Sequence, residues 1–470
     1  MIDRREILEM SRELSLAPQV VEKDHALGWV LAGIYSHPDL RESWIFKGGT
    51  CLKKCYFETY RFSEDLDFTL TEESHLDESF LQKTFAEVSG WVYEQCGMEI
   101  PLDTLAFEVY ANPRGKNSVA GKVGYRGPLG MRGSIPRIRL DLTCDECVVD
   151  QPVWCSVHHP YQDDTDQYMR AFCYSFTELF AEKIRALAER LRPRDLYDAV
   201  HLYRHEQGTC DRALVLETLQ QKCRFKGIDV PTAESLSSHP GRAELVSEWE
   251  NMLAHQLPKL PPLDLFDQEL PAVFAWLLEA RTRPAIPAMA AAADEDSSWR
   301  APSMVTSWGL MAPLETIRYA AVTHLCVNLR YKGTERLIEP YSLRRTQQGD
   351  ILLHAICHEG GEHRSYRIDR IEAAAATATP FVPRYAVELT PSGTQVIPDQ
   401  THTYSGGYRV PSRRRPSAPF NTGGPRYIVE CALCGKRFKR KQYSTKLNKH
   451  KDKSGYPCMG RTGYLVDTVY

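Results

Sequence analysis

The stretch from Phe46 to Leu70 reads FKGGTCLKKCYFETYRFSEDLDFTL. It joins a glycine pair, Gly48 and Gly49, to two aspartates, Asp65 and Asp67, that lie two residues apart in a run rich in β-forming residues. Because side chains alternate across a strand, both carboxylates are expected to point to the same face. The stretch therefore predicts a strand that carries paired carboxylates and faces a glycine-rich turn.

This arrangement suits Mg²⁺ that carries a nucleoside triphosphate. Mg²⁺ prefers oxygen ligands and is usually bound by one or two carboxylates together with substrate phosphates. Gly48 and Gly49 allow the backbone to approach phosphate oxygens closely, and the hydroxyls of Thr50 and Ser63 can add contacts. The combination points to nucleotidyl transfer.

A third carboxylate is needed for two-metal phosphoryl chemistry, because it completes one metal site and helps to deprotonate the attacking hydroxyl. Asp141 is the candidate, since it lies in the alternating run from Arg137 to Leu142, which is expected to be a strand. Asp145 and Glu146, just beyond this run, are the alternatives.

Two helical segments farther along the chain carry charged pairs. Glu182 and Lys183 lie in the first, and Arg194, Asp195 and Asp198 lie in the second. Lys183 is expected to neutralise triphosphate charge, Arg194 to lie near the substrate, and Asp195 or Asp198 to orient the cations. Such pairs are normally surface ion pairs of little energetic value. The interpretation therefore depends on the glycine pair, the paired aspartates and the charged helical pairs occurring together in this order.

The order of the expected elements indicates an α+β fold. Apolar residues recur at helical spacings from Arg4 to Ser36, and helical patterns return from Thr177 to about Arg281. Strand-like runs lie between them at Phe46, Leu66–Leu70, Phe107–Tyr110 and Ile138–Leu142. A chain of 470 residues, 43% of them apolar, is expected to form about three folded domains. Residues 1–282 are predicted to be the first, a core with a helical C-terminal subdomain.

Charge and cysteine usage separate the C-terminal segment from the rest. The chain has a net charge of −3, yet residues Arg426 to Tyr464 contain eleven Lys and Arg against two acids, a local +9 that leaves about −12 elsewhere. Only this segment has the charge of a polyanion-binding module. The 14 cysteines are otherwise scattered singly, and no export signal is recognised, so reduced thiols and a cytoplasmic location are expected. No apolar run approaches the ~20 residues of a membrane-spanning helix.

The first domain resembles a known family. Its motifs, in order, are FKGGTCLKKCYF, RFSEDLDFTL, the strand ending in Asp141, ELFAEKIRALAER and PRDLYDAVHL. They resemble those of the AbiEii/AbiGii-type toxin nucleotidyltransferases of the DNA polymerase β-like superfamily, and VVEKDHALGWVL is similar to that family's helical lead-in. The resemblance covers roughly Ser11 to Arg281 and is specific because several spaced motifs agree.

The resemblance implies a polymerase β-like core and Mg²⁺-dependent transfer of NMP from an NTP to a hydroxyl, with two Mg²⁺ ions. Asp65, Asp67 and Asp141 would be the metal carboxylates. Lys183 and Asp195 would be further active-site residues.

A small β domain is expected after a Pro- and Ala-rich linker. The linker spans residues 283–303, and the domain, residues 304–400, alternates short β-type runs with polar turns. It resembles a WYL domain, an Sm-like β-barrel of bacterial defence and regulatory proteins, through its flanking arginines and the Glu339-Pro340-Tyr341 turn. Ile351-Leu352-Leu353 stands in place of the naming triplet. Four arginines could bind a nucleotide or oligonucleotide, or only cover the exterior of the barrel: Arg344, Arg364, Arg367 and Arg370.

A zinc-binding module, residues 426–470, is expected after a second linker, residues 401–425. Cys431, Cys434, His450 and Cys458 provide three sulfurs and one imidazole, a set that favours tetrahedral, structural Zn²⁺ with no open position. A domain of about forty residues has too small a hydrophobic core to be stable alone and needs a bound metal or a similar cross-link. The basic residues between the ligands would contact phosphates without reading sequence, or would form a solvated or protein-docking face.

The order of modules, together with the final Tyr470, resembles the Hailong-type antiphage nucleotidyltransferases. This resemblance implies template-free synthesis of short DNA oligomers from dATP, primed on a mobile tail that ends in Tyr470 and read by a partner channel protein. Two alternatives remain: a toxin that adds nucleotides to the acceptor end of tRNA, and a nucleic-acid-binding regulator with an inactive transferase fold. Expected partners are thus a (d)NTP, a nucleic acid and an effector or antitoxin protein. An oligomer is compatible with all three candidate functions.

Overall fold

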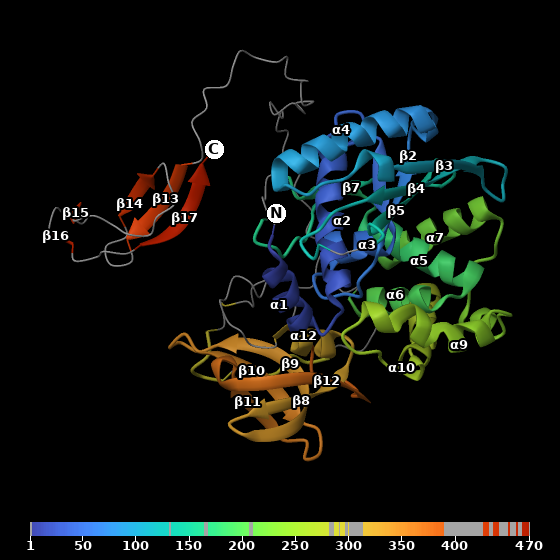
Figure 1. The fold of residues 1–470 in the computed structure, drawn as a ribbon. Helices are drawn as coiled ribbons and strands as arrows, with labels where there is room; N and C mark the ends of the chain where they lie inside the picture. The colour runs from blue at the N-terminus through green and yellow to red at the C-terminus, as the bar shows by residue number, and fades with distance from the viewer. Residues whose placement is uncertain are drawn as a thin grey trace, which may run out of the picture. The chain divides into compact units, whose positions relative to one another are not determined.

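The computed structural model describes residues 2–130, 133–163, 168–205, 210–281, 286–290, 292–296, 299, 314–389, 426–431, 436–440, 450–451, 457–458 and 463–469. The chain divides into two compact units, Met1–Val410 and Pro411–Tyr470 (Figure 1). Among the helices that the structure describes, none combines the length and the apolar character needed to cross a bilayer.

A seven-stranded mixed sheet forms the centre of the first unit, with the strand order β3-β4-β5-β2-β1-β7-β6. Its strands are β1 (Trp44–Lys47), β2 (Asp65–Leu70), β3 (Ala106–Ala111), β4 (Asn117–Gly124), β5 (Arg137–Thr143), β6 (Val153–Ser156) and β7 (Arg170–Cys173). The pairs β2–β5 and β1–β7 are parallel, and the other neighbours are antiparallel. The predicted α+β class is confirmed, and β4, β6 and β7 are additions to the expected strands.

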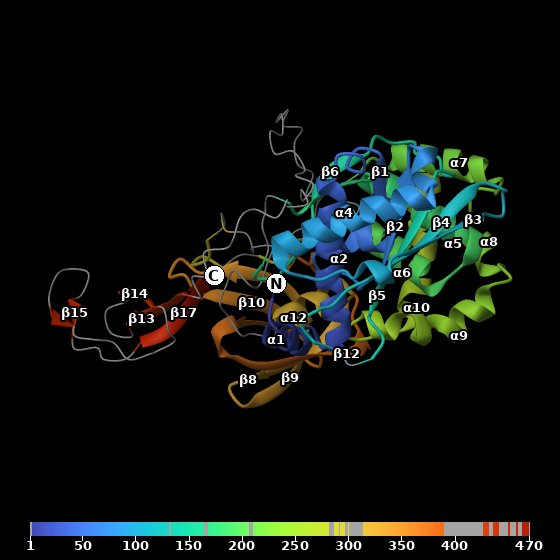
Figure 2. The ribbon, with the colours of Figure 1, turned by 45° about the horizontal axis from the view of Figure 1, so that its top comes forward.

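Helices cover both faces of this sheet (Figures 1 and 2). The N-terminal helices are α1 (Arg4–Leu14) and α2 (Pro18–Ser36), and α4 (Glu78–Cys96) follows β2. α2 and α4 pack together on one face, where Trp29 of α2 lies beside Trp91 of α4 and Trp44 of β1 contacts Phe85. These buried aromatic side chains fix the helices against β1, which pairs with β2, the strand that carries Asp65 and Asp67.

The helical subdomain lies on the other side. Its helices are α5 (Phe176–Arg190), α6 (Pro193–Arg204), α7 (Arg212–Lys226), α8 (Ala233–Ser237), α9 (Arg242–Leu253), α10 (Leu263–Asp267) and α11 (Leu270–Glu279). Ser175 caps α5 by accepting a hydrogen bond from the backbone N–H of Glu178. Pro193, which interrupts the helical pattern, begins α6, because its missing N–H has no partner in a first helical turn. The short α5–α6 connection places the end of one helix beside the start of the next.

The β domain consists of α12 (Leu314–Val322) and a five-stranded sheet in the order β11-β10-β9-β8-β12. The strands are β8 (Leu325–Tyr331), β9 (Thr334–Arg345), β10 (Ile351–Cys357), β11 (His363–Arg367) and β12 (Ile371–Pro380). α12 joins the β domain to the N-terminal helices, since the Thr316 hydroxyl donates to the carbonyl of Glu13 in α1. The predicted turn at Glu339-Pro340-Tyr341 is instead part of β9, where the pairing with β10 shifts register and thereby tolerates a proline.

The described parts of the predicted first linker pack against this sheet. The backbone of Asp296 donates to the carbonyl of Arg345, and Met289 is buried beside Tyr341. Three of the four arginines proposed as ligand-binding form ion pairs: Arg344 with Glu388, Arg364 with Glu362, and Arg367 with Asp350 and Asp369. They therefore contribute to the packing or the surface of the β domain itself.

The second unit contains a three-stranded sheet in the order β14-β13-β17, beside the short β15–β16 pair. The strands are β13 (Arg426–Cys431), β14 (Arg437–Arg440), β15 (His450–Lys451), β16 (Pro457–Cys458) and β17 (Gly463–Val469). The segment expected to be a mobile tail is thus a strand up to Val469, paired along β13. Tyr470 lies outside the described residues.

Candidate active site

The strand register aligns three charged residues across the sheet. Asp67 of β2 lies opposite Asp141 in the parallel pairing with β5, and Lys47 of β1 lies opposite Asp67 on the other side. Residues opposite one another share a face of the sheet. Asp65 points to the same face as Asp67, because both are half-buried whereas Leu66 between them is fully buried. Three carboxylates thus lie near one another on adjacent strands.

The environment of these acids favours a bound cation. Within the described part of the chain, none of Asp65, Asp67 and Asp141 forms an ion pair with a basic side chain. Burial, and then the neighbouring charge of Asp141, raises the pKa of Asp67 to about 6. Burial likewise raises the pKa of Asp141. A cluster of oxygen ligands that forms no direct ion pair with a described basic side chain fits a hard divalent cation such as Mg²⁺.

Gly48 permits the close approach of the chain to Asp67. Its φ of +83° is one that residues with a side chain rarely adopt, and a Cβ there would lie 2.1 Å from Oδ2 of Asp67. The predicted glycine turn is instead the start of a short helix, α3 (Gly48–Cys51), which continues into a π-helical segment, Leu52–Tyr56. Gly48 therefore allows the chain to turn from β1 directly into a helix that begins next to Asp67.

A cavity of about 340 Å³ opens beside the acids. Its lining is mostly charged and comprises Gly49, Arg61, Ser63, Asp65, Asp67, Lys183, Arg190, Arg192, Arg194, Asp195 and Met252. Four guanidinium groups and one ammonium group face two carboxylates of the strand. This distribution suits a polyanion held together with a metal ion.

One buried carboxylate holds two of these cations in place. Asp198 of α6 has no exposed surface; Nε and Nη2 of Arg61 both lie 2.7 Å from its oxygens, and Nζ of Lys183 lies 2.7 Å from Oδ2. The Tyr60 hydroxyl also donates to it. Although burial alone would raise the pKa of Asp198, the charges of Arg61 and Lys183 hold it well below the usual range. Asp198 therefore remains a carboxylate and orients both cations.

A second carboxylate orients Arg190. Asp195, at the start of α6, accepts from Nε of Arg190 at 2.7 Å and from Nη2 at 2.9 Å. Such a two-point contact fixes the plane of a guanidinium group. Asp195 and Asp198, the two acids predicted to orient cations, therefore contact different cations.

The predicted residues fall into two groups. Those that line the cavity are Gly49, Ser63, Asp65, Asp67, Lys183, Arg194 and Asp195. Those outside the lining are Gly48, Thr50, Asp141 and Asp198. Thr50 instead donates its hydroxyl to the carbonyl of Asp65 and so secures the start of β2. The alternative acids are already paired, Asp145 with Arg114 at 2.8 Å and Glu146 with Lys226 at 3.1 Å.

Sequence reasoning assigned no role to Arg61, Arg190 and Arg192 of the lining. Arg61 lies two residues before Ser63, inside the stretch that was used to predict the site, and the other two lie at the α5–α6 connection. The closeness of these three arginines in the sequence to the predicted phosphate-binding residues is the feature that could have identified them.

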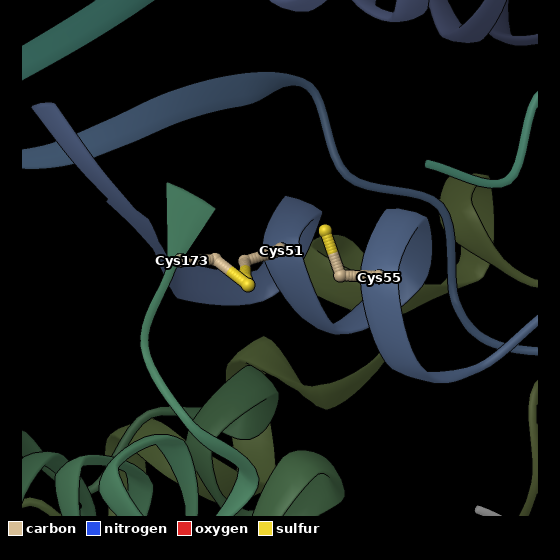
Figure 3. A group of neighbouring side chains, drawn as sticks. All are labelled: Cys51, Cys55 and Cys173. Carbon is tan, nitrogen blue, oxygen red and sulfur yellow. The ribbon is translucent and has the colours of Figure 1, made fainter. Parts of the chain in front are cut away.

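A cluster of three cysteines lies where the end of β7 meets the helical segment that follows β1 (Figure 3). Cys51 and Cys55 are one helical turn apart, Cys173 ends β7, and their sulfur atoms all lie within 4.8 Å of one another. All three thiols are buried. They are a possible ligand set for a soft metal ion, although neutral thiols also pack well as small apolar groups. The expectation of singly scattered cysteines therefore missed a cluster that forms only in the fold.

The predicted zinc ligands are described in part. The sulfur atoms of Cys431 and Cys458 lie 3.8 Å apart, and Phe438 packs against both buried side chains. The backbone of His450 pairs with that of Cys458, while Cys434 and the side chain of His450 lie outside the described residues.

Comparison with family models gives two matches. Residues 29–280 match the model described as nucleotidyl transferase AbiEii toxin, Type IV TA system, and residues 313–376 match the WYL domain. A comparison with curated proteins finds no match.

Solved structures similar to this chain include two bacterial proteins. MenT4, a nucleotidyltransferase toxin from Mycobacterium tuberculosis H37Rv, is 18% identical, with 58% of this chain and 89% of MenT4 covered and a TM-score of 0.38. JHP933 from Helicobacter pylori is 16% identical, with 56% of this chain and 94% of JHP933 covered and a TM-score of 0.35.

Proposed function

This chain belongs to the AbiEii family of nucleotidyltransferase toxins, and from that membership we propose that it transfers NMP from a Mg²⁺-bound nucleoside triphosphate to a hydroxyl in a toxin or defence role. The triphosphate binds in the cavity beside Asp65 and Asp67. The observation that carries the proposal is the register that sets Asp67 opposite Asp141, in front of a cavity lined by arginines and a lysine.

The carboxylates and cations have complementary roles. Asp65, Asp67 and Asp141 bind two Mg²⁺ ions, which when bound neutralise phosphate charge and lower the pKa of an attacking hydroxyl. Lys183, fixed by Asp198, binds phosphate oxygens, and Arg190, fixed by Asp195, offers a planar pair of donors to another phosphate. Arg61 is buried and bonds to Asp198 and Gln256, so it contributes positive charge and holds Asp198 in place. Because acids of the fold orient the cations beforehand, little reorganisation is needed when substrate binds.

The test is transfer from each labelled NTP and dNTP, with and without Mg²⁺. We expect transfer that is lost with EDTA and in Asp65→Asn/Asp67→Asn. Asp145→Asn is the matched control, because Asp145 is a neighbouring acid already paired with Arg114. Full biological activity of the double variant would instead favour a nucleic-acid-binding regulator with an inactive transferase fold.

The hydroxyl that accepts the nucleotide is a more specific part of the proposal. Template-free synthesis of DNA oligomers from dATP, primed on Tyr470, is the first candidate, and addition to the acceptor end of tRNA is the second. Label on the protein that is lost in Tyr470→Phe supports priming, whereas label found only on added tRNA contradicts it. Mass spectrometry of the C-terminal peptide would identify substrate, acceptor and primer together.

We further infer a structural Zn²⁺ bound by Cys431, Cys434, His450 and Cys458. The Cys431–Cys458 sulfur separation of 3.8 Å supports it, since Zn–S bonds of about 2.3 Å in a tetrahedron place sulfurs about 3.8 Å apart. The basic strands of this module then offer phosphate contacts to a nucleic acid.

A further inference from the structure

A second cluster of potential metal ligands lies away from the cavity. His25 of α2 meets His159 and Asp163, which belong to the segment between β6 and β7. Oδ2 of Asp163 lies 3.0 Å from Nε2 of His25, and Oδ1 lies 3.5 Å from Nε2 of His159. One ligand atom from each of the three residues lies within 4.8 Å of the others. None of the three lines the cavity beside Asp65.

Hydrogen bonding within the protein accounts for only part of this arrangement, since Nε2 of His25 bonds to Oδ1 of Asp163 at 3.2 Å and to Oδ2 at 3.0 Å. Among the residues that the structure describes, neither ring nitrogen of His159 has a hydrogen-bond partner, and Nδ1 of His25 also has none. Both imidazole rings are completely buried, with 0% and 1% of His25 and His159 exposed. A buried polar atom without a partner costs about 1–3 kcal/mol, so two adjacent histidines in this state call for a ligand.

The separations fit a tetrahedral centre. With metal–nitrogen and metal–oxygen bonds of about 2.0–2.1 Å, ligand atoms at two corners of a tetrahedron lie about 3.3 Å apart. The 3.0 Å and 3.5 Å between Asp163 and the two imidazole nitrogens bracket this value. One ion between the three groups would thus give Nε2 of His159 the partner that it lacks.

Neighbouring contacts hold the cluster in place. The Tyr161 hydroxyl donates to the carbonyl of Val21 at 3.0 Å and to Oδ2 of Asp24 at 2.9 Å, both on α2. A Cβ at position 28 would lie 2.2 Å from Nδ1 of His159, so Gly28 is what allows that ring to pack against α2. The two histidines are therefore fixed relative to each other by contacts that do not involve a metal.

We propose that His25, His159 and Asp163 bind one divalent transition-metal ion, of which Zn²⁺ fits the ligand set best, and that this ion fastens the β6–β7 segment to α2. Two imidazoles and a carboxylate suit Zn²⁺ better than Mg²⁺, which prefers oxygen ligands alone. Asp163 is 15% exposed, so of the three groups only the carboxylate reaches solvent.

The test measures metal bound to the full chain. Purified protein is stripped of metal, reloaded with Zn²⁺, dialysed, and analysed for zinc per chain in the wild type, His159→Gln and Asp163→Asn. We expect each variant to hold one ion fewer than the wild type. His37→Gln is the matched control and should retain the wild-type content, because His37 is a buried histidine whose Nε2 lies 3.2 Å from a carboxylate, that of Glu87, outside the cluster.

Cobalt substitution separates this site from the cysteine sites. The difference spectrum of Co²⁺-loaded wild type minus Asp163→Asn should show visible cobalt absorption without a thiolate-to-cobalt charge-transfer band. Zn²⁺ should also raise the melting temperature of the wild type more than that of Asp163→Asn. Equal zinc content in wild type, His159→Gln and Asp163→Asn would overturn the proposal, as would a difference spectrum dominated by thiolate charge transfer. Asp163→Asn is partly exposed and keeps the test decisive if His159→Gln does not fold.

Discussion

The ammonium group of Lys183 lies 2.7 Å from Asp198, a carboxylate with no exposed surface that also binds the guanidinium group of Arg61. One acid in the core thus determines where two positive charges of the cavity point. Since a buried charge is tolerated only when it is paired, the stability of the fold and the shape of the site depend on the same contact.

Replacement of this acid should therefore unfold the protein more readily. Asp198→Ala leaves two cations without their buried partner, and we expect a loss of about 3–5 kcal/mol in the free energy of unfolding. Urea denaturation measures it. Glu9→Ala, which removes an exposed ion pair with Arg5, should cause a far smaller change. Similar losses in the two variants would mean that Asp198 is not a structural anchor.

The same contact predicts an acid sensitivity. The pKa of Asp198 in the folded state lies below its ordinary value, so its stabilisation is fully present above the unfolded pKa of about 3.9 and is lost as the pH falls toward the lower folded pKa. Below about pH 4, the wild type should lose stability more steeply than Asp198→Ala. Denaturation midpoints between pH 2 and 6 measure this, and parallel curves would contradict it.

Gly48→Ala tests the approach of the chain to Asp67. The new Cβ would clash with Oδ2 at 2.1 Å, and the residue would keep a φ of +83°. Gly115→Ala is the matched control, because Gly115 has a φ of +74° and no neighbour within 4 Å. The control should lose about 1–2 kcal/mol from the strained backbone alone. Gly48→Ala should lose more and should bind Mg²⁺ more weakly by calorimetry; equal effects would show that Asp67 can move aside.

Sequence patterns identified the site residues whose placement depends only on their neighbours along the chain. Asp65 and Asp67 follow from strand alternation, and Asp141 follows from a second alternating run, although their common register required the structure. Patterns did not predict the contact between His25 and His159, or between Cys51 and Cys173, because each joins segments more than a hundred residues apart. Nor did they predict that Gly48 starts a helix, because a glycine pair is compatible with turns and helix starts alike.

Removal of one sulfur ligand should release zinc from the C-terminal module. We expect Cys431→Ser to hold one ion fewer per chain than the wild type, since a tetrahedral site with three protein ligands binds zinc less tightly. Cys144→Ser is the control, because Cys144 belongs to no cluster of ligands among the described residues. Unchanged zinc in Cys431→Ser, measured by elemental analysis, would contradict the assignment.

The third carboxylate can be identified by comparing three neighbouring acids. Asp141 lies opposite Asp67 without an ion pair among the described residues, whereas Asp145 and Glu146 are held by Arg114 and Lys226. Asp141→Asn should therefore reduce nucleotidyl transfer by about 100-fold or more, because loss of a group that only orients a metal ligand already costs about 10–100-fold. Asp145→Asn and Glu146→Gln should stay within a few-fold of the wild type, because their charges balance basic side chains rather than a metal. Initial rates at saturating nucleotide and varied Mg²⁺ measure this, and the Mg²⁺ concentration for half-maximal rate should rise only in Asp141→Asn. A larger defect in Asp145→Asn or Glu146→Gln would transfer the metal-binding role to that acid.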